Sequence, residues 1–327
     1  MSAAVVPSVT LALLVGLFAL KGRRTFHEML FPGLYRSVEF PEDRFPADDA
    51  HAFRERVADG YDRMRNASVV ICGITRNDAE TLPLAIQRIE RMAACFRDHH
   101  VVVFENDSTD RTPALLGEWA GRNPNVTVLS EPSQGVQGLP SDRFERLALC
   151  RNRYVDWMNA TAKGGREGYV IVLDFDLRGG WSLDGIASTF AENDWDAVGS
   201  NSLGYHNLRR TYYDMAALRP RTVLRETWWH RLVGEAWQLR RGTPMIPVES
   251  AFGGLGVYRR EVFRSRRYSG RFHGAPACEH LSLNPDGRLR AFLNPSQITV
   301  VGTQEERATR EQWPAWRRDL HHLLRNW

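Results

Sequence analysis

Lysine is almost missing from this sequence of 327 residues. It occurs only at Lys21 and Lys163, so arginine supplies nearly all of the 43 basic residues. Arginine suits planar, bidentate contacts with phosphates and carboxylates, although a GC-rich genome would produce the same bias without any function. The net charge is only +4, and the basic residues are scattered rather than gathered in a stripe. This distribution argues against a dedicated nucleic-acid binder, so we expect no nucleic acid among the partners.

Cysteine is also scarce, and its spacing excludes the usual cysteine-based sites. The four cysteines lie far apart and form no CxxC pair. No zinc site or disulfide framework is indicated, and a reducing compartment fits this usage best. With 43% hydrophobic and 25% charged residues, the chain is typical of a globular protein. Its length suffices for one large α/β domain with appendages or for two small domains.

Charged side chains are absent from the first twenty residues, and the basic run KGRR follows directly. A helix of about twenty residues spans roughly 30 Å, the thickness of a bilayer core. A cleavable signal peptide would carry its basic residues in front of the apolar run. We therefore predict a single-pass N-terminal anchor over residues 1–24 and a membrane-associated protein whose main domain faces the cytoplasm. A soluble hydrophobic helix is the alternative, because Pro7, Ser8 and Thr10 interrupt the run.

The rest of the chain divides into three segments. Residues 25–66 are rich in Pro, Asp and Arg, with one plausible helix after PADD, and we interpret them as a stem. Residues 67–305 form the main domain. Residues 306–327 place tryptophans and leucines on one face of a basic amphipathic helix. Such a helix either docks onto the domain or lies on a membrane surface.

From residue 67 onward, apolar strand patterns alternate with helical ones. Strands are predicted at ASVVICGIT, HVVVFEND, VTVLS, YVIVLDFD and DAVGSNS, and helices are predicted at 82–96, TPALLGEWA and 142–160. Continuous apolar strands indicate a sheet covered on both faces. The alternation predicts a mostly parallel, Rossmann-like sheet with helices on both faces. Ligands of such sheets bind beyond the carboxyl ends of the strands, and three of these strands end in polar residues.

The fourth strand ends in two aspartates, Asp174 and Asp176. Side chains alternate along a strand, so both carboxylates are expected to point the same way and to need a positive charge between them. In one reaction class, the carboxylates hold Mg²⁺ or Mn²⁺ together with a nucleotide diphosphate. In another, one aspartate is a phosphoryl-accepting nucleophile, but such phosphatases use a downstream lysine and both lysines here lie upstream. Turn aspartates without a chemical role are the third alternative.

Arg151 lies on the inward stripe of the helix predicted at 142–160. A guanidinium on a buried face needs an anionic partner, which is either a strand-end aspartate or a ligand phosphate. Gly253 and Gly254 interrupt an apolar run, where the backbone can approach a ligand closely or form a bulge. Glu279 and His280 stand side by side as an acid and a potential metal ligand, or as a solvent-facing pair.

With these pieces in order, the chain resembles glycosyltransferases of the GT-A fold and, more narrowly, the cryptococcal capsule-associated α-1,3-mannosyltransferase family. The matching stretches lie in collinear order over residues 67–290. They read ICGITRNDAETLPLAIQRIE, VVVFENDSTDRTPALL, RLALCRNRYVDW, YVIVLDFDLRGGW, WDAVGSNS, YYDMAALR, ESAFGGLGVYRREVF and CEHLSLN.

The resemblance implies a role for each candidate residue. Residues implied to bind the nucleotide sugar are Thr75, Arg76, Glu105, Asp107, Arg151, Asp174, Gly253 and Gly254. Metal ligands are implied at Asp174, Asp176 and His280, with Mn²⁺ or Mg²⁺ as cofactor. Glu279 and Asp176 are the implied catalytic residues, and Tyr213 and Asp214 would face the acceptor.

The resemblance also implies the reaction. A hexose, with mannose favoured, would move from a nucleotide-diphosphate sugar such as GDP-mannose to a glycan or a lipid-linked acceptor. The alternatives are a phosphoryl- or nucleotidyl-transfer enzyme that uses Asp174 and Asp176, and a nucleotide-sugar binding protein without turnover.

Overall fold

A computed structural model describes residues 32–131, 140, 142–161, 168–206, 209–221 and 239–303. Its strands are β1 Ser68–Thr75, β2 Asp98–Glu105, β3 Val126–Ser130, β4 Tyr169–Leu173, β5 Gly180–Trp181, β6 Ala197–His206, β7 Arg209–Tyr212, β8 Arg219–Pro220, β9 Ile246–Ser250, β10 Leu255–Arg259, β11 Arg271–Phe272, β12 Ala275–Pro276 and β13 Ala291–Thr303. Its helices are α2 Pro32–Tyr35, η1 Glu42–Arg44, α3 Ala50–Asn66, α4 Leu82–Ala93, α5 Thr112–Arg122, α6 Arg143–Ala160, α7 Leu183–Phe190, α9 Val262–Ser265 and η3 Glu279–Leu283.

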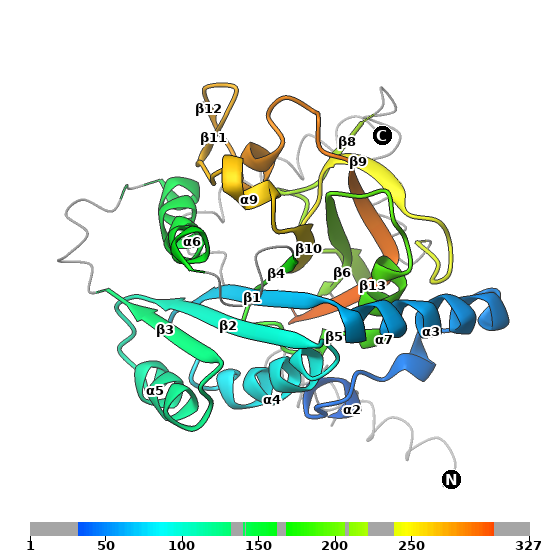
Figure 1. Ribbon diagram of the computed structural model, residues 1–327, viewed down its shortest axis with the longest axis horizontal. Helices are drawn as coiled ribbons and strands as arrows, with labels where there is room; N and C mark the ends of the chain where they lie inside the picture. Colours follow the sequence, from blue (N-terminus) through cyan, green and yellow to red (C-terminus); the bar gives the residue numbers. More distant parts are fainter. Residues whose placement is uncertain are drawn as a thin grey trace, which may run out of the picture.

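One large mixed sheet organises these elements (Figure 1). Its strand order is β3-β2-β1-β4-β10-β6-β13-β9-β8, with β5 beside β13 and β7 beside β6. The first four strands are parallel, so their carboxyl ends meet at one edge. The direction reverses at β10, which runs antiparallel to both β4 and β6, whereas β6 and β13 are parallel to each other. The predicted α/β class with a mostly parallel sheet is confirmed.

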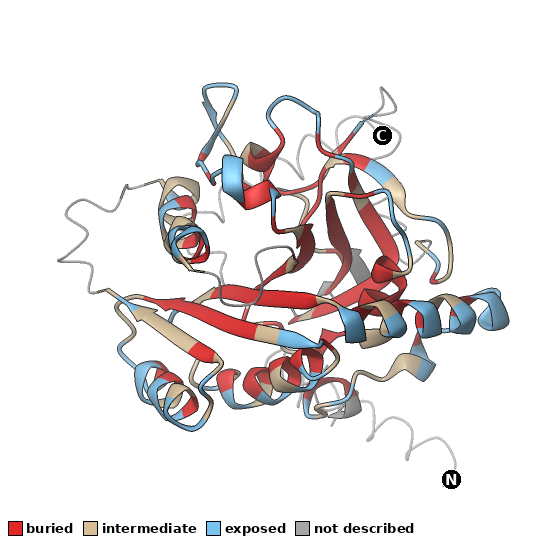
Figure 2. Ribbon diagram, viewed as in Figure 1, coloured by how far each residue is buried: buried red, intermediate tan, exposed pale blue. Residues whose placement is uncertain are grey.

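Strands β1, β2 and β4 are mostly buried on both faces, as their continuous apolar sequences require, whereas the edge strand β3 is only partly buried (Figure 2). In β1, Val69 and Ile71 pack in one core cluster, and Val70 and Cys72 pack in the other. Helices α3, α4, α5 and α7 contribute side chains to the first cluster, and α6 contributes to the second. Helices therefore cover both faces of the parallel strands.

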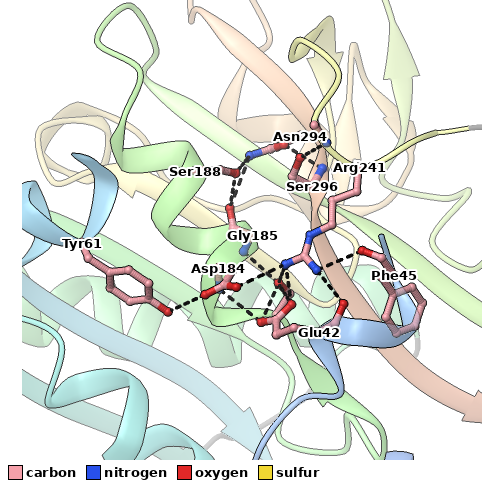
Figure 3. A network of polar contacts seen from close by, with 11 residues as sticks. Glu42, Phe45, Tyr61, Asp184, Gly185, Ser188, Arg241, Asn294 and Ser296 are labelled. Carbon is pink, nitrogen blue, oxygen red and sulfur yellow. Dashed lines mark hydrogen bonds and ion pairs between the residues drawn. The ribbon is translucent and has the colours of Figure 1, made fainter. Parts of the chain in front are cut away.

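A polar network attaches the segment before β1 to the rest of the domain (Figure 3). Arg241 is 5% exposed and donates to the carboxylate of Glu42 and to the carbonyl of Phe45. The Glu42 carboxylate also accepts from the hydroxyl of Ser182, at the start of α7. Tyr61 on α3 donates to Asp184 at 3.0 Å. Residues 42–61, which lie within the predicted stem, are thus held against α7 by charged hydrogen bonds.

The prediction of a single-pass anchor is not supported. No helix in the described ranges is long and apolar enough to cross a membrane. The two longest helices, α3 and α6, carry several arginines and acids and bury only one face each. The anchor predicted at 1–24 and the amphipathic helix predicted at 306–327 lie outside the described residues.

Candidate functional site

Two polar loops follow β1 and β2 at the carboxyl edge of the sheet, and they are bound to each other. Asn77, which has a positive φ of 55°, receives a hydrogen bond from the backbone of Thr109 and donates its own N–H to Ser108. The backbone of Ala79 donates to the carboxylate of Asp110 at 3.0 Å. These contacts make one rigid shelf from the stretches TRND and ENDSTD, as expected for parallel strand ends.

The predicted nucleotide-binding side chains on this shelf differ in accessibility. Glu105 is 3% exposed, and its carboxylate accepts hydrogen bonds from the backbone of Ser108 and the hydroxyl of Ser130. Thr75 is also buried, and its hydroxyl donates to Asp78. Glu105 and Thr75 thus stabilise the two loops from the buried side. The two predicted residues that reach the surface are Arg76 and Asp107.

Arg76 is exposed and Asp107 is partly exposed, at φ 53°. A left-handed backbone is uncommon outside glycine, and it turns the Asp107 side chain away from the strand direction. Asn106 donates to this carboxylate at 3.0 Å. Of the predicted shelf residues, these two are the ones placed to meet a ligand.

Asp174 and Asp176 lie in the turn that follows β4 and not in the strand itself. The alternation of the strand nevertheless continues through the turn. Ile171, Leu173 and Phe175 all pack in the first core cluster, so the two aspartates between and after them face the side of α6 and are partly exposed. The prediction that both carboxylates point the same way is confirmed.

A buried arginine joins this turn to η3. Arg151 on α6 is 3% exposed. It donates through Nη2 to Asp174 at 3.0 Å and through Nε to Glu279 at 2.9 Å. Its guanidinium also lies 5.1 Å from the ring centre of Phe252 and 5.9 Å from that of Tyr268. The anionic partner predicted for Arg151 is therefore a strand-end aspartate, together with Glu279.

Glu279 is placed behind this arginine. It is 2% exposed, and the guanidinium of Arg151 separates it from the turn of Asp174. A carboxylate that is buried and ion-paired does not reach an incoming acceptor in this arrangement. The geometry favours a role for Glu279 in holding Arg151, and proton abstraction by Glu279 stays a prediction.

Tyr213 and Asp214 close the other side of the turn. Burial and then the negative charges of Asp174 and Asp176 raise the pKa of Tyr213, so its hydroxyl lies near both carboxylates. Asp214 accepts hydrogen bonds from the backbone of Gly253 at 3.0 Å and of Ala217 at 3.3 Å. Burial raises the pKa of Asp214 to about 6, against these hydrogen bonds. Near neutral pH this carboxyl group is close to its titration point.

This raised pKa predicts a pH-dependent effect of Asp214→Asn. Between about pH 4 and pH 6 the unfolded chain releases the proton that the folded chain keeps, so rising pH destabilises the wild type. The asparagine variant has no such group. We expect the free energy of unfolding of the wild type, relative to the variant, to fall by about 2 kcal/mol from pH 4 to pH 7. Urea titrations at several pH values measure the difference, and a gap independent of pH would contradict it.

Gly253 and Gly254 form a tight turn between β9 and β10 with φ values of 69° and 76°. Their free faces are filled by protein, because a Cβ atom would lie 2.3 Å from the carbonyl oxygen of Ser200 or 2.7 Å from the side chain of Leu177. Their backbone holds the site: Gly253 donates to Asp214, and Gly254 accepts from the N–H of Asp174 at 2.8 Å. The close approach predicted for these glycines is thus made to the protein, and contact with a ligand stays a prediction.

We expect Gly253→Ala to lower the free energy of unfolding by about 2–4 kcal/mol, from left-handed strain plus overlap with Ser200. Gly274→Ala is the matched control. Its φ is 83°, but no atom lies within 4 Å of the added methyl group. The control should therefore cost only about 1–2 kcal/mol of backbone strain. Equal losses in the two variants, measured by chemical denaturation, would show that the packing against Ser200 has no effect.

His280 is buried on η3 beside Glu279. Its ring stacks on Phe252 with 3.7 Å between ring centres. Nε2 lies 3.6 Å from the Glu279 carboxylate, and neither ring nitrogen makes a hydrogen bond to the described residues. Burial, followed by the charge of Arg151, lowers its pKa well below the usual value, so the imidazole is neutral. A neutral ring with available nitrogens has the chemistry of a metal ligand.

The fit of a divalent cation is best at the two aspartates. Asp174 uses Oδ1 for Arg151, and Oδ2 makes no hydrogen bond to the described residues. In this part of the chain, no three His, Cys, Asp or Glu residues are grouped so that they could hold a metal by themselves. Asp174, Asp176 and His280 therefore do not form a preassembled site. Mg²⁺ commonly binds through one or two carboxylates plus substrate phosphates, and the two aspartates fit that pattern.

One positive residue at the site was missed from the sequence. Arg143 is exposed in the first turn of α6. Burial raises the pKa of both Asp174 and Tyr213, and the positive charge of Arg143 opposes that rise in both groups. The helix begins after Asp142, whose side chain caps it by accepting from Glu145. The sequence feature that could have indicated Arg143 is its position on the same helix as Arg151, eight residues earlier.

The surface formed by the described residues includes a small and a larger hollow. One of about 130 Å³ lies beside the shelf and is lined by Asn106, Cys150 and their neighbours. The other, of about 330 Å³, lies at the opposite edge of the sheet. Its lining residues Arg63 and Arg259 already donate to Asn193. The smaller hollow is the one next to the candidate site.

No family model and no curated protein matches this sequence. Among solved structures, a mannosyltransferase from Pyrobaculum calidifontis in complex with GDP-Man and Mn²⁺ is 17% identical, with 94% of this chain and 71% of that chain covered and a TM-score of 0.43. S. aureus TarS with UDP-GlcNAc is 14% identical, with 73% and 59% covered and a TM-score of 0.44. Glucosyl-3-phosphoglycerate synthase from Mycobacterium tuberculosis with UDP is 14% identical, with 77% and 76% covered and a TM-score of 0.41.

Proposed function

We propose that this protein is a glycosyltransferase that takes its sugar from a nucleotide-diphosphate donor with the help of Mn²⁺ or Mg²⁺. One observation carries the proposal. Asp174 and Asp176 face the same side at the carboxyl edge of four parallel strands, and two arginines, Arg143 and Arg151, lie beside them. Carboxylates suit a divalent cation, and guanidinium groups suit the phosphates that the cation would bridge.

The proposed division of labour follows from which groups are accessible. Asp174 and Asp176 would hold the cation, which when bound would neutralise charge on the departing diphosphate. Arg143 is exposed and would contact a phosphate directly, whereas Arg151 would keep Asp174 in place. Each well-placed charge of this kind contributes about 3–4 kcal/mol to stabilising the transition state.

The two ends of the donor would lie on either side of this turn. Arg76 and Asp107 on the shelf would contact the nucleoside, supported by the buried Thr75 and Glu105. The sugar would lie toward Tyr213, with Asp214 placed for the acceptor. Gly253 and Gly254 would position both Asp174 and Asp214 through their backbone.

For the donor and acceptor we propose GDP-mannose and a glycan or a lipid-linked glycan. Support for mannose comes from the resemblance of the motifs to the cryptococcal capsule-associated mannosyltransferases. Phosphoryl transfer by Asp174 has less support, because one carboxylate oxygen of Asp174 already accepts from Arg151 at 3.0 Å and burial raises the pKa of this carboxyl group.

A thermal-shift experiment tests the proposal. The purified protein is heated with GDP or UDP, each with and without Mn²⁺, and then with the matching nucleotide sugars. We expect a nucleoside diphosphate to raise the melting temperature only when the metal is present, since a ligand at about 100 times its Kd adds about 2.7 kcal/mol. Release of GDP from GDP-mannose in the presence of acceptor glycans then measures transfer. A metal-independent shift without donor turnover would indicate a binding protein instead.

A further inference from the structure

Arg88 is a buried arginine outside the candidate site that has no acidic partner among the described residues. It lies on α4, is 6% exposed, and burial lowers its pKa to about 10. A buried guanidinium without a carboxylate must be satisfied by other acceptors. Within the described ranges, all of its hydrogen bonds go to backbone carbonyl oxygens.

These carbonyls belong to two segments that are far apart in the sequence. Nη1 donates to Leu177 at 3.2 Å and to Arg178 at 2.9 Å. Nε and Nη2 donate to Ser37 at 3.1 and 2.7 Å, and Nη2 also reaches Leu34 at 3.4 Å. Arg88 therefore connects the segment 34–37 to the residues that directly follow Asp176.

The turn of Asp176 depends on such contacts because it has left the sheet. Strand β4 ends at Leu173. The N–H of Asp174 donates to Gly254 at one end of the turn, and the N–H of Gly179 donates to Val300 at the other. Between these two anchors, the carbonyls of Leu177 and Arg178 are held by Arg88.

The packing around the guanidinium is tight. Gly180, at φ 70°, lies against it, and a Cβ atom there would be 2.9 Å from the Cζ atom of Arg88. On the other side of the turn, Phe175 fills the space beside Gly73. Because the guanidinium is closely packed, a displacement of the Arg88 side chain would also displace the turn that it contacts.

We propose that Arg88 is a positioning residue that sets the orientation of Asp176 by holding the carbonyls of Leu177 and Arg178. The inference rests on the proposed function, because it assigns Arg88 to the support of the metal-binding turn. Only an arginine suits this position: its planar fork reaches both segments, whereas the single ammonium group of lysine does not. Groups that orient metal ligands typically affect metal affinity by about 10–100-fold when mutated.

Full-length Arg88→Lys and Arg88→Met test this role, with Arg260→Met as the matched control. Arg260 is also buried and donates to the carbonyls of Met158 and Thr161, but it lies at the opposite edge of the sheet. The first readout needs no ligand: hydrogen exchange followed by mass spectrometry on the metal-free protein. We expect faster exchange over residues 174–180 in both Arg88 variants and wild-type exchange there in Arg260→Met.

The second readout is the Mn²⁺ concentration that gives half of the nucleoside-diphosphate thermal shift. We expect it to rise about tenfold or more in Arg88→Lys and to stay unchanged in Arg260→Met, even if both lose stability. Unchanged exchange over 174–180, or an unchanged Mn²⁺ midpoint in a folded Arg88→Lys, overturns the inference. If the wild type itself shows no metal-dependent shift, the proposed function fails and the metal-related role of Arg88 fails with it. The exchange data then still decide whether Arg88 holds the turn.

Discussion

Replacing Arg151 with methionine is expected to lower the free energy of unfolding by about 3–5 kcal/mol. The change removes a cation that is hydrogen-bonded to both Asp174 and Glu279, and Glu279 is 2% exposed. Methionine keeps much of the volume between Phe252 and Tyr268, so the loss measures the charge rather than a cavity. Urea denaturation followed by circular dichroism gives the value.

Two further variants test whether the lost stability comes from the buried carboxylates that Arg151 leaves unpaired. Adding Glu279→Gln to Arg151→Met removes one of the two stranded carboxylates and should restore part of the lost stability. Arg271→Met breaks an exposed ion pair with Glu145 and should cost less than about 1 kcal/mol. A loss of that small size in Arg151→Met would mean that the buried ion cluster does not stabilise the fold.

The parallel half of the sheet could be predicted because its inner strands β1, β2 and β4 contain continuous apolar runs. The pattern YVIVL needs cover on both faces, and β4 has it. The same rule located Arg151: a cation on the inward stripe of α6 required an acid, and Asp174 is that acid. Local periodicity and desolvation cost were sufficient for these conclusions.

The other half of the sheet was less predictable because its contacts are long-range. Strand β13 carries asparagine, serine and glutamine in its interior. These side chains are satisfied by distant partners, as when Gln297 donates to Ser200 and accepts from Thr189. Hydropathy alone gives such a stretch no strand signal. A polar segment becomes a central strand only when the fold supplies its partners.

The candidate site also has features that could be predicted from local sequence and features that depend on long-range contacts. Which side the two aspartates face follows from a period of two, and the structure agrees. The burial of Glu105 and Glu279 could not be read from neighbouring residues, because both carboxylates are satisfied by partners from other elements. Arg88 gave no signal at all, since its partners are backbone carbonyls, which every residue has.

Asp176→Asn is expected to lower the rate of sugar transfer at saturating donor by at least about 100-fold while leaving the melting temperature nearly unchanged. Asp176 is partly exposed, and a charged contact at such a position contributes only about 0–1 kcal/mol to the free energy of unfolding. Asparagine has nearly the same shape but lacks the negative charge that a divalent cation requires. Asp98→Asn, at an exposed aspartate at the start of β2, is the control and should retain wild-type rates.

The same pair of variants tests whether the lower rate of sugar transfer results from weaker metal binding. In Asp176→Asn the thermal shift caused by a nucleoside diphosphate should no longer depend on Mn²⁺, whereas Asp98→Asn should show the wild-type dependence. Glutamate at position 176 keeps the charge but extends the side chain by one methylene group. Partial recovery of the Mn²⁺ response in Asp176→Glu would indicate a carboxylate that binds the cation directly. Full transfer activity in Asp176→Asn would exclude this carboxylate from the reaction and, with it, a metal held by the turn that follows β4.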